Sequence, residues 1–381
     1  MEFSWSEEQL LLRQSAKEFA ERTAKRDLVN RNRVSDFDRS LWEECAKFGL
    51  LGLPMPVSHG GRGLDAMSAM LAMEGFGVGC RDHGLSLGLN AQLWTVQMAI
   101  LKYGTEQQQH QYLPGLIQGL IIGAQSFTEP EAGSDLGHLK TRAIKTDGGY
   151  ILNGHKIYIT LGPVADVVVV YAQLGETPGR WGLTSFLLDT KRPGCHVSEN
   201  RPKMGLRTLP FGDIELRDCF VEETSRLGPE RGGAAVAANS LEWERSCMLA
   251  CQLGAMERQL AETSEYARTR NQFGQAIRKF QSVSNRLAEM KLRLEASRWM
   301  VYHAAWLKQT GQRSTLESAM AKLSLTEAWL ASSLDAMRVQ GARGYVEEFE
   351  VERELRDAAG GVIYGGTSDI QRNIIAGHLG V

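Results

Sequence analysis

Long hydrophobic runs and an excess of charge of one sign are both missing from this sequence. Lys and Arg number 43 against 45 Asp and Glu, giving a formal net charge of −2, whereas nucleic-acid-binding proteins usually have a basic excess. The apolar runs, of which residues 167–171 are typical, are far shorter than the ~20 residues of a membrane-spanning helix. The first residues also lack the basic and apolar pattern of a secretory signal. We therefore expect no nucleic-acid partner, no membrane span and a cytoplasmic protein, or a matrix protein if the chain is a processed mitochondrial one.

Paired cysteine motifs are also missing. The six cysteines are scattered, with no Cys-x-x-Cys pair, and no histidine spacing completes a zinc site. Cys247 and Cys251 lie one helical turn apart, but two small core residues are the favoured interpretation, because free cysteines are often buried. No metal site is predicted.

Glycine is abundant where proline is not, with 40 glycines against 10 prolines in 381 residues. This length predicts two or three domains, and the pattern changes character twice. Residues 1–120 read as helices, with a capping box at Ser6 and Gln9 and further N-caps at Asp38, Asp65 and Thr105. This region is predicted to be an N-terminal all-helical domain.

Residues 121–230 are predicted to form a middle β domain. Asp147-Gly148-Gly149 separates two alternating runs, and Asn153-Gly154 gives a second turn signal. Residues 167–171 and 185–188 are typical of buried strands.

Residues 231–381 return to the helical period. We expect one helix over 235–268, a second over 279–309, a third opened by a capping box at Ser314 and Glu317 and lasting to about 339, and a short one after Thr367. Long helices with short connections pack as an antiparallel four-helix bundle. The fold class is thus α+β, in the order helical, β, helical.

Glu244 is the carboxylate in an apolar setting. In a continuous helix, positions 241, 244, 248, 251 and 255 share one face and read Leu, Glu, Met, Cys, Ala. A buried carboxylate must be paired or protonated. The pattern leaves two interpretations open, a salt bridge to Arg245 or another helix, and a general base whose pKa is raised by its apolar surroundings.

Two loops are candidates for ligand binding. Residues 128–135 offer hydroxyls and open backbone N–H groups, although the same string also suits a tight turn. Residues 341–344 are Gly-rich and contain Arg343, which suits a diphosphate. Neither loop matches the strand-to-helix GxGxxG or the GKS/T phosphate loop.

Taken together, these clusters resemble the acyl-CoA dehydrogenase family over nearly the whole chain. The strings that carry the resemblance are F-T-E-P-E-A-G-S-D at 127–135, L-N-G-H-K-I-Y-I-T at 152–160, K-M-G-L-R at 203–207, R-T-R-N-Q-F-G-Q at 268–275 and D-A-M-R-V-Q-G-A-R-G-Y at 335–345. The implied fold has an N-terminal helical domain, a middle β-barrel-like domain and a C-terminal four-helix bundle.

The resemblance implies FAD, bound without a covalent bond and shared between subunits of a homotetramer. By matching position, the flavin ring would be contacted by Phe127, Thr128, Gly133, Ser134, Tyr158, Ile159 and Thr160, and the adenosine half by Thr367 and Asp369. A neighbouring subunit would supply Arg270, Gln272, Phe273, Gln281, Arg338, Gly341 and Ala342. Substrate would meet Ser134, Arg245 and Tyr364.

The implied chemistry is α,β-dehydrogenation of an acyl thioester, and the departures from the family pattern refine it. Many members carry the catalytic base in a Tyr-Glu-Gly-Thr segment, but here Gly365 occupies the glutamate position. Relatives similar to isovaleryl-CoA dehydrogenases supply the glutamate from the long helix instead, and Glu244 matches that arrangement. Gly365 retains its N–H for polarising the thioester carbonyl. Tyr158 stands where the family usually has Trp, and Ala342 where it usually has Gly.

The thioester carrier and the electron acceptor stay open. The acyl group is expected to be short, branched or cyclic, carried either by coenzyme A, as in isovaleryl-CoA, or by a carrier protein, as a prolyl group. Electrons would pass to an electron-transferring flavoprotein or, in an oxidase, to oxygen. A catalytically silent flavoprotein scaffold is the alternative from another class.

Overall fold

The computed structural model describes residues 4–175 and 179–381. Residues 1–3, on which the N-terminal signal prediction partly depends, lie outside them. The N-terminal helices are α1 (Glu7–Thr23), α2 (Leu28–Val34), α3 (Arg39–Phe48), α4 (Ala66–Gly79), α5 (His83–Ala91), α6 (Met98–Tyr103) and α7 (Glu106–Ile117). The predicted caps at Ser6, Asp38, Asp65 and Thr105 are confirmed, each side chain accepting a hydrogen bond from the backbone N–H three residues later.

The middle region is built on one eight-stranded sheet. Its strands are β1 (Gly123–Ser126), β2 (Arg142–Thr146), β3 (Gly149–Thr160), β4 (Val167–Leu174), β5 (Leu183–Asp189), β6 (Cys195–Val197), β7 (Phe211–Glu222) and β8 (Arg226–Leu227). The order is β6-β7-β3-β2-β4-β5-β8, and β1 pairs with β4 in parallel. The two predicted buried strands are confirmed as parts of β4 and β5.

The second predicted turn in this region is wrong. Asn153-Gly154 lies inside β3, where the pairing with β7 shifts register between Leu152 and Gly154. The Asn153 side chain accepts from the backbone N–H of Asp218, and its amide donates to the Asp218 carboxylate. Asp218 has a φ of 46°. The dipeptide therefore forms a bulge between two long strands.

The C-terminal region contains α8 (Gly233–Glu244), α9 (Ala250–Thr269), α10 (Gln281–Gln309), α11 (Thr315–Gln340), α12 (Val351–Gly361) and α13 (Ser368–Leu379), with a hairpin of β9 (Asn271–Gln272) and β10 (Gln275–Ala276). The single helix expected over 235–268 is wrong, because α8 ends at Glu244. Ser246 leaves the helical region with φ −129° and ψ −87°, and its hydroxyl donates to the carbonyl of Glu242. Such a back-bond favours a bend.

Two further details of this region differ from the prediction. Ser314 is the N-cap of α11, but its hydroxyl is buried and makes no capping hydrogen bond, so the expected capping box is absent there. Helix α12 was not predicted. The six cysteines are free, and Cys247 and Cys251 are buried, as the core interpretation expects. No described helix has the length and apolarity to span a membrane, and the described residues contain no cluster of metal-ligating side chains.

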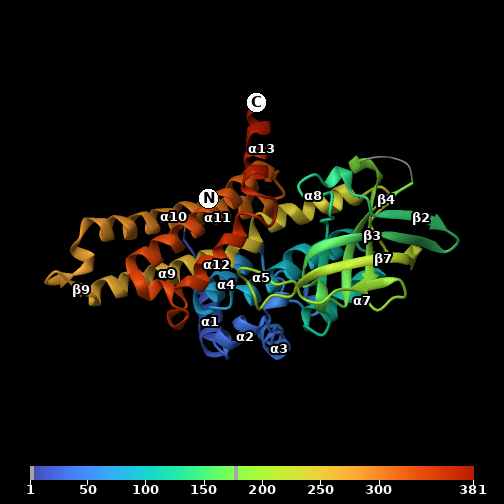
Figure 1. Ribbon diagram of the computed structural model, residues 1–381. Coiled ribbons are helices and arrows are strands. Elements are labelled where there is room, and N and C mark those ends of the chain that lie inside the picture. Colours follow the sequence, from blue (N-terminus) through green and yellow to red (C-terminus); the bar gives the residue numbers. More distant parts are fainter. Residues whose placement is uncertain (1–3, 176–178) are drawn as a thin grey trace.

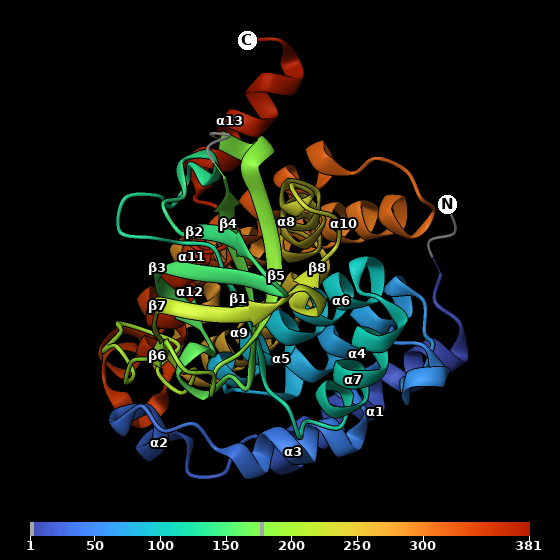
Figure 2. The same ribbon diagram turned by 90° about the vertical axis from the view of Figure 1, so that its right-hand side faces the viewer.

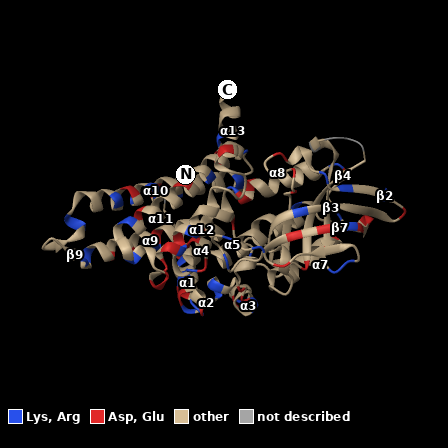
Figure 3. Ribbon diagram, in the orientation of Figure 1, with Lys and Arg blue, Asp and Glu red and all other residues tan. Residues whose placement is uncertain are grey.

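The sheet lies at one end of the molecule and the long helices α9, α10 and α11 at the other (Figure 1), with β9 at the far tip. Viewed from the sheet side, α1, α2 and α3 run along the bottom and α13 projects at the top (Figure 2). Acidic and basic residues are interspersed over both the sheet and the long helices (Figure 3).

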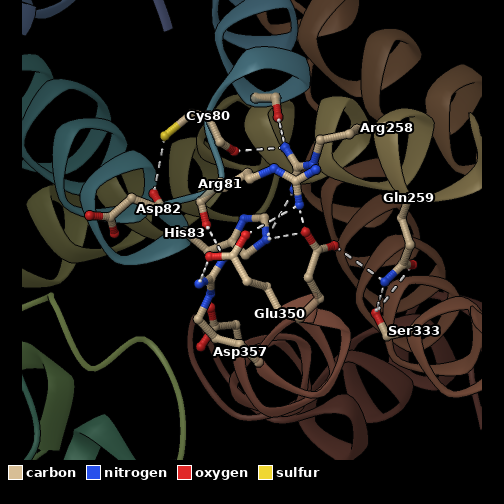
Figure 4. A network of polar contacts seen from close by, with 12 residues as sticks. Cys80, Arg81, Asp82, His83, Arg258, Gln259, Ser333, Glu350 and Asp357 are labelled. Atoms are coloured by element: carbon tan, nitrogen blue, oxygen red, sulfur yellow. Dashed lines mark hydrogen bonds and ion pairs between the residues drawn. The ribbon is translucent and has the colours of Figure 1, made fainter. Parts of the chain in front are cut away.

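A buried ion network joins the N-terminal helices to the C-terminal ones (Figure 4). Arg258 of α9 donates to Glu354 of α12 at 2.7 Å and to the carbonyl of Cys80 at 2.7 Å. Burial alone would raise the pKa of Glu354, but Arg258 and His83 outweigh it and hold that pKa well below its usual range. The network fixes α4, α9 and α12 relative to one another.

Candidate active site

A cavity of about 530 Å³ opens between the sheet, the N-terminal helices and the C-terminal region. It is where the end of α8 meets the segment before α13. The lining includes twelve of the sequence-predicted site residues: Phe127, Thr128, Gly133, Ser134, Tyr158, Ile159, Thr160, Glu244, Arg245, Tyr364, Gly365 and Thr367. The structure thus brings together residues that are far apart in the chain, such as Phe127 and Thr367, which are separated by 240 positions.

The loop at 127–135 is held in place by a buried ion pair that the sequence reading missed. The ammonium of Lys156 lies 2.7 Å from the Glu129 carboxylate and 2.7 Å from the carbonyl of Tyr171. Glu129 also accepts from the backbone N–H and hydroxyl of Thr141. Burial lowers the pKa of Lys156 to about 8 against the attraction of Glu129. Glu129 and Lys156 therefore position the loop and do not line the cavity.

The end of β3 forms another wall. Tyr158 adopts a φ of 62°, a strained value for a residue other than glycine. Its half-exposed ring stacks on Phe211 at 5.8 Å between centroids, and the guanidinium of Arg201 lies 5.2 Å from it. The stack and the adjacent guanidinium hold an aromatic surface at the edge of the cavity.

Glu244 and Gly365 face each other inside the cavity. A Cβ placed on Gly365 would lie 3.4 Å from Oε1 of Glu244, so a side chain at this position would be in contact with the Glu244 carboxylate. Gly365 has a φ of 65°, which favours glycine. A side chain at 365 and the carboxylate at 244 are therefore alternative ways of filling one site, which supports the sequence-based link between them.

The Glu244 carboxyl is electrostatically unusual. Burial raises its pKa above the ordinary value, against the opposing attraction of Arg245 and Lys322 and the backbone N–H of Gly365. Arg245 instead donates from Nε to the carbonyl of Gly365 at 3.0 Å, and the described residues give Glu244 no ion pair within 4.0 Å. The salt-bridge interpretation is not supported. Lys322 of α11 is buried, and burial lowers its pKa to about 8.

Tyr364 is a half-buried phenol beside this carboxylate. Its hydroxyl accepts from Nε2 of Gln252 at 3.1 Å, and burial raises its pKa far above the ordinary tyrosine value. It stays a neutral hydroxyl at physiological pH.

The break after α8 changes how Glu244 reaches the cavity. Leu241, Glu244 and Met248 line the cavity, whereas Cys251 and Ala255 are buried and do not line it. The five-residue face expected from a continuous helix is therefore only partly right. The turn at Ser246 places the carboxylate at the end of α8, beside the segment that carries Gly365.

Eight predicted cofactor residues lie outside the cavity, and all are exposed in the single chain: Arg270, Gln272, Phe273, Gln281, Arg338, Gly341, Ala342 and Asp369. Phe273 is 93% exposed beside β9, at the end of the molecule opposite the sheet (Figure 1). Asp369 pairs with Arg372 at 2.8 Å, and Arg338 with Asp335 at 3.4 Å. Their expected role toward a neighbouring subunit stays a prediction.

Comparison with known families decides the classification. The N-terminal, middle and C-terminal domain models of acyl-CoA dehydrogenase match residues 6–120, 124–219 and 231–380. The chain belongs to the acyl-CoA dehydrogenase family. Its fold of helical, β and helical domains, its oxidoreductase class and FAD as its cofactor are thereby confirmed.

Among the relatives of this chain, an L-prolyl-[peptidyl-carrier protein] dehydrogenase of Pseudomonas fluorescens is 44% identical over 90% of each chain. A protein of the same name from a Serratia species is 38% identical over 100% of this chain and 99% of the other. Mitochondrial isovaleryl-CoA dehydrogenase of Pongo abelii is 35% identical over 97% of this chain and 88% of the relative.

Two solved structures are also similar to this chain over nearly its whole length. The prolyl acyl carrier protein oxidase AnaB superposes with a TM-score of 0.98 at 43% identity, covering 99% of this chain and all of the other. PigA with FAD and proline superposes with a TM-score of 0.97 at 38% identity, covering 100% and 99%.

The cavity lining suits the flavin of FAD. Flavins need a flat, mostly apolar slot with a few directed hydrogen bonds. Thr128, Ser134 and Thr160 place hydroxyls along a wall that also contains the Phe127 ring. At Gly133 an added Cβ would approach no atom closer than 3.9 Å, so the loop leaves room for a planar group.

Proposed function

We propose that this chain dehydrogenates the Cα–Cβ bond of a prolyl group carried as a thioester on a carrier protein. The observation that carries the proposal is the Glu244–Gly365 pair inside the common cavity. The two named L-prolyl relatives and the superposition on PigA with FAD and proline support the prolyl group and its carrier.

Glu244 has the properties of a base for an α-proton. Burial raises its pKa, which makes the carboxylate a stronger proton acceptor near neutral pH. The nearby charges of Arg245 and Lys322 oppose this rise in the pKa. We place the departing α-proton on Glu244 and the developing negative charge on the thioester oxygen. When substrate is bound, the Gly365 N–H, which otherwise acts on the Glu244 carboxylate, would donate to this oxygen.

FAD, when bound, supplies the acceptor for the hydride that leaves Cβ. The electron balance closes, because the proton and the hydride together remove two hydrogens and leave a Cα=Cβ double bond. The chain's own part is to orient the thioester between Glu244 and the loop at 127–135. It also excludes water with apolar side chains such as Leu241 and Met248.

An oxidase is the second candidate, since the superposed AnaB is named a prolyl acyl carrier protein oxidase. The half-exposed Tyr158 lies at the edge of the cavity, and we place the route of oxygen to the flavin beside this side chain. Stopped-flow reoxidation separates the two functions. Reoxidation of the reduced flavin by air within a turnover identifies an oxidase, and slow reoxidation that an electron-transferring flavoprotein accelerates identifies a dehydrogenase.

The proposal includes a cytoplasmic homotetramer in which the exposed residues around Arg270 complete the FAD site of a neighbouring subunit. Their exposure in the single chain, at the end opposite the sheet and away from the cavity of the same chain, supports this arrangement. Light scattering on the FAD-loaded protein gives the subunit number.

A thioester panel tests the substrate. The oxidised protein is mixed without oxygen with L-prolyl-carrier protein, isovaleryl-CoA, isobutyryl-CoA and longer acyl-CoAs while flavin absorbance is recorded. We expect rapid bleaching with the prolyl-carrier protein. Bleaching by the acyl-CoAs alone would refute the prolyl assignment and retain the family chemistry.

A further inference from the structure

Gln125 is a polar side chain on the cavity wall, and the proposed reaction gives it no role. It lies on β1, which runs parallel to β4 in the register Gln125 to Val169. Gly123, Ala124 and Gln125 of β1 all line the cavity, as does Phe127 just after the strand. The intervening Ser126 faces the other way and donates to the carbonyl of Val169.

The amide of Gln125 is incompletely satisfied. Its Oε1 is buried without a hydrogen-bond partner, and among the cavity-lining residues that the structure describes this is the one such side-chain atom. Several other polar side chains on the lining have partners. Thr95 donates to the carbonyl of Ala91 at 2.6 Å, and Thr367 accepts from the backbone N–H of Ile370 at 3.2 Å. An orphaned buried acceptor indicates a missing donor.

The strand that carries Gln125 and the helix that carries Glu244 contact the same π-helical segment. The π-helical segment η3 (Gln92–Gln97) contacts β1 on one side, where Gln92 accepts from the N–H of Gly123 at 2.7 Å. On its other side, Ser240 of α8 donates to the carbonyl of Thr95 at 3.2 Å. Gln125 and Glu244 therefore approach one cavity from elements that flank η3.

Most cavity-lining side chains around η3 are apolar, namely Leu87, Ala91, Val96, Leu241 and Met248, and the polar Thr95 is already hydrogen-bonded to the carbonyl of Ala91. A wall of this kind is sufficient for a purely hydrocarbon acyl group. A buried acceptor in this wall is favourable only if the bound acyl group brings a donor. Without one, the amide loses its hydrogen bonds to water and gains none in exchange, which costs free energy.

We propose that Gln125 determines specificity by accepting a hydrogen bond from an N–H of the acyl group, as a prolyl ring offers and a hydrocarbon ring does not. This inference rests on the proposed function. It assigns the ring nitrogen to the Gln125 side of the cavity and the α-carbon to the Glu244 side.

The test compares two thioesters that differ only in this group, L-prolyl and cyclopentanecarbonyl, each loaded on the same carrier protein. The anaerobic rate of flavin bleaching is measured for the wild type, Gln125→Leu and Gln125→Glu. The wild type should favour the prolyl thioester by at least about tenfold, because a site built for a donor rejects the analogue that lacks it. Gln125→Leu should lose this preference by slowing on the prolyl thioester alone, and Gln125→Glu, which keeps an acceptor, should retain it.

The alternative results are distinguishable. Equal slowing of Gln125→Leu on both thioesters, or loss of its FAD, would overturn the inference, because the amide would then serve the cofactor or the fold. Equal wild-type rates on the two thioesters would also overturn it while leaving the Glu244 chemistry intact. A wild type that bleaches with neither thioester refutes the proposed function itself.

Discussion

Introducing a second carboxylate at position 365 is the sharpest structural test of the Glu244–Gly365 relation. In Gly365→Glu the new Cβ lies 3.4 Å from Oε1 of Glu244, so we expect the two carboxyl groups to lie close together in the cavity. At a separation of ~5 Å and an effective dielectric constant of 20, two such charges repel by about 3 kcal/mol, or roughly two pKa units. One carboxyl will then stay protonated near neutral pH, as in other close carboxylate pairs.

The assay is the pH dependence of anaerobic flavin bleaching by the reactive thioester. Because the ionised base is the active form, the rate rises with pH through the pKa of the base. We expect the rising limb of Gly365→Glu to move to higher pH by one to two units, in proportion to that repulsion. The unfolding temperature should fall only modestly. A residue other than glycine at a φ of 65° lowers the free energy of unfolding by about 1–2 kcal/mol.

Gly365→Ala is the matched control, because it has the same backbone strain and no second charge. Its rising limb should coincide with that of the wild type. If Gly365→Glu and Gly365→Ala show the same limb, the two carboxyl positions do not share a site and the reasoning is refuted.

Two further predictions concern the ion network and the cofactor. Glu354→Gln leaves Arg258 buried without its carboxylate, so urea unfolding should show a loss of about 3–5 kcal/mol, against under ~1 kcal/mol for Glu352→Gln, whose ion pair with Arg356 is more exposed. Because the folded pKa of Glu354 is depressed, its contribution is present above the unfolded pKa of about 4.3 and lost as pH falls below it. The wild-type advantage over Glu354→Gln should therefore shrink in acid, and a constant difference would contradict the pairing. Arg270→Ala should weaken FAD binding by about 10–100-fold through loss of a charged contact, whereas Arg268→Ala should not, and equal FAD titrations of the two would contradict the shared site.

Much of the fold follows from local signals in the sequence. Side-chain caps such as Asp38 and Thr105 act within one helical turn, so composition is enough to find them. The hairpin at 147–149 is equally local. These features survive because no distant contact competes with them.

What could not be predicted depends on contacts across the chain. No glycine or proline marks the end of α8 at Glu244. The helix ends where Arg245 donates to the carbonyl of Gly365, which lies 120 positions away in the chain. Ser314 fits a capping pattern, yet its buried hydroxyl makes no cap. Local propensity is a weak prior where tertiary packing decides.

The candidate site shows the same division. The cavity residues of the loop at 127–135 and of the end of β3 were found through the family strings, and Glu244 through the missing side chain at 365. Gln125 and the Glu129–Lys156 pair were not assigned a role, because a glutamine in a strand and an ion pair across 27 positions leave no periodic signal. Only the cavity shows that Gln125 faces it with an unmatched acceptor.

The central claim is that Glu244 removes the α-proton, and anaerobic mixing of FAD-loaded Glu244→Gln with L-prolyl-carrier protein tests it most directly. Glu242→Gln is the matched control, because Glu242 pairs with Lys308 and Thr315 and lies outside the cavity. We expect both variants to bind FAD and only Glu242→Gln to bleach on mixing. Bleaching of Glu244→Gln at the wild-type rate would contradict the account.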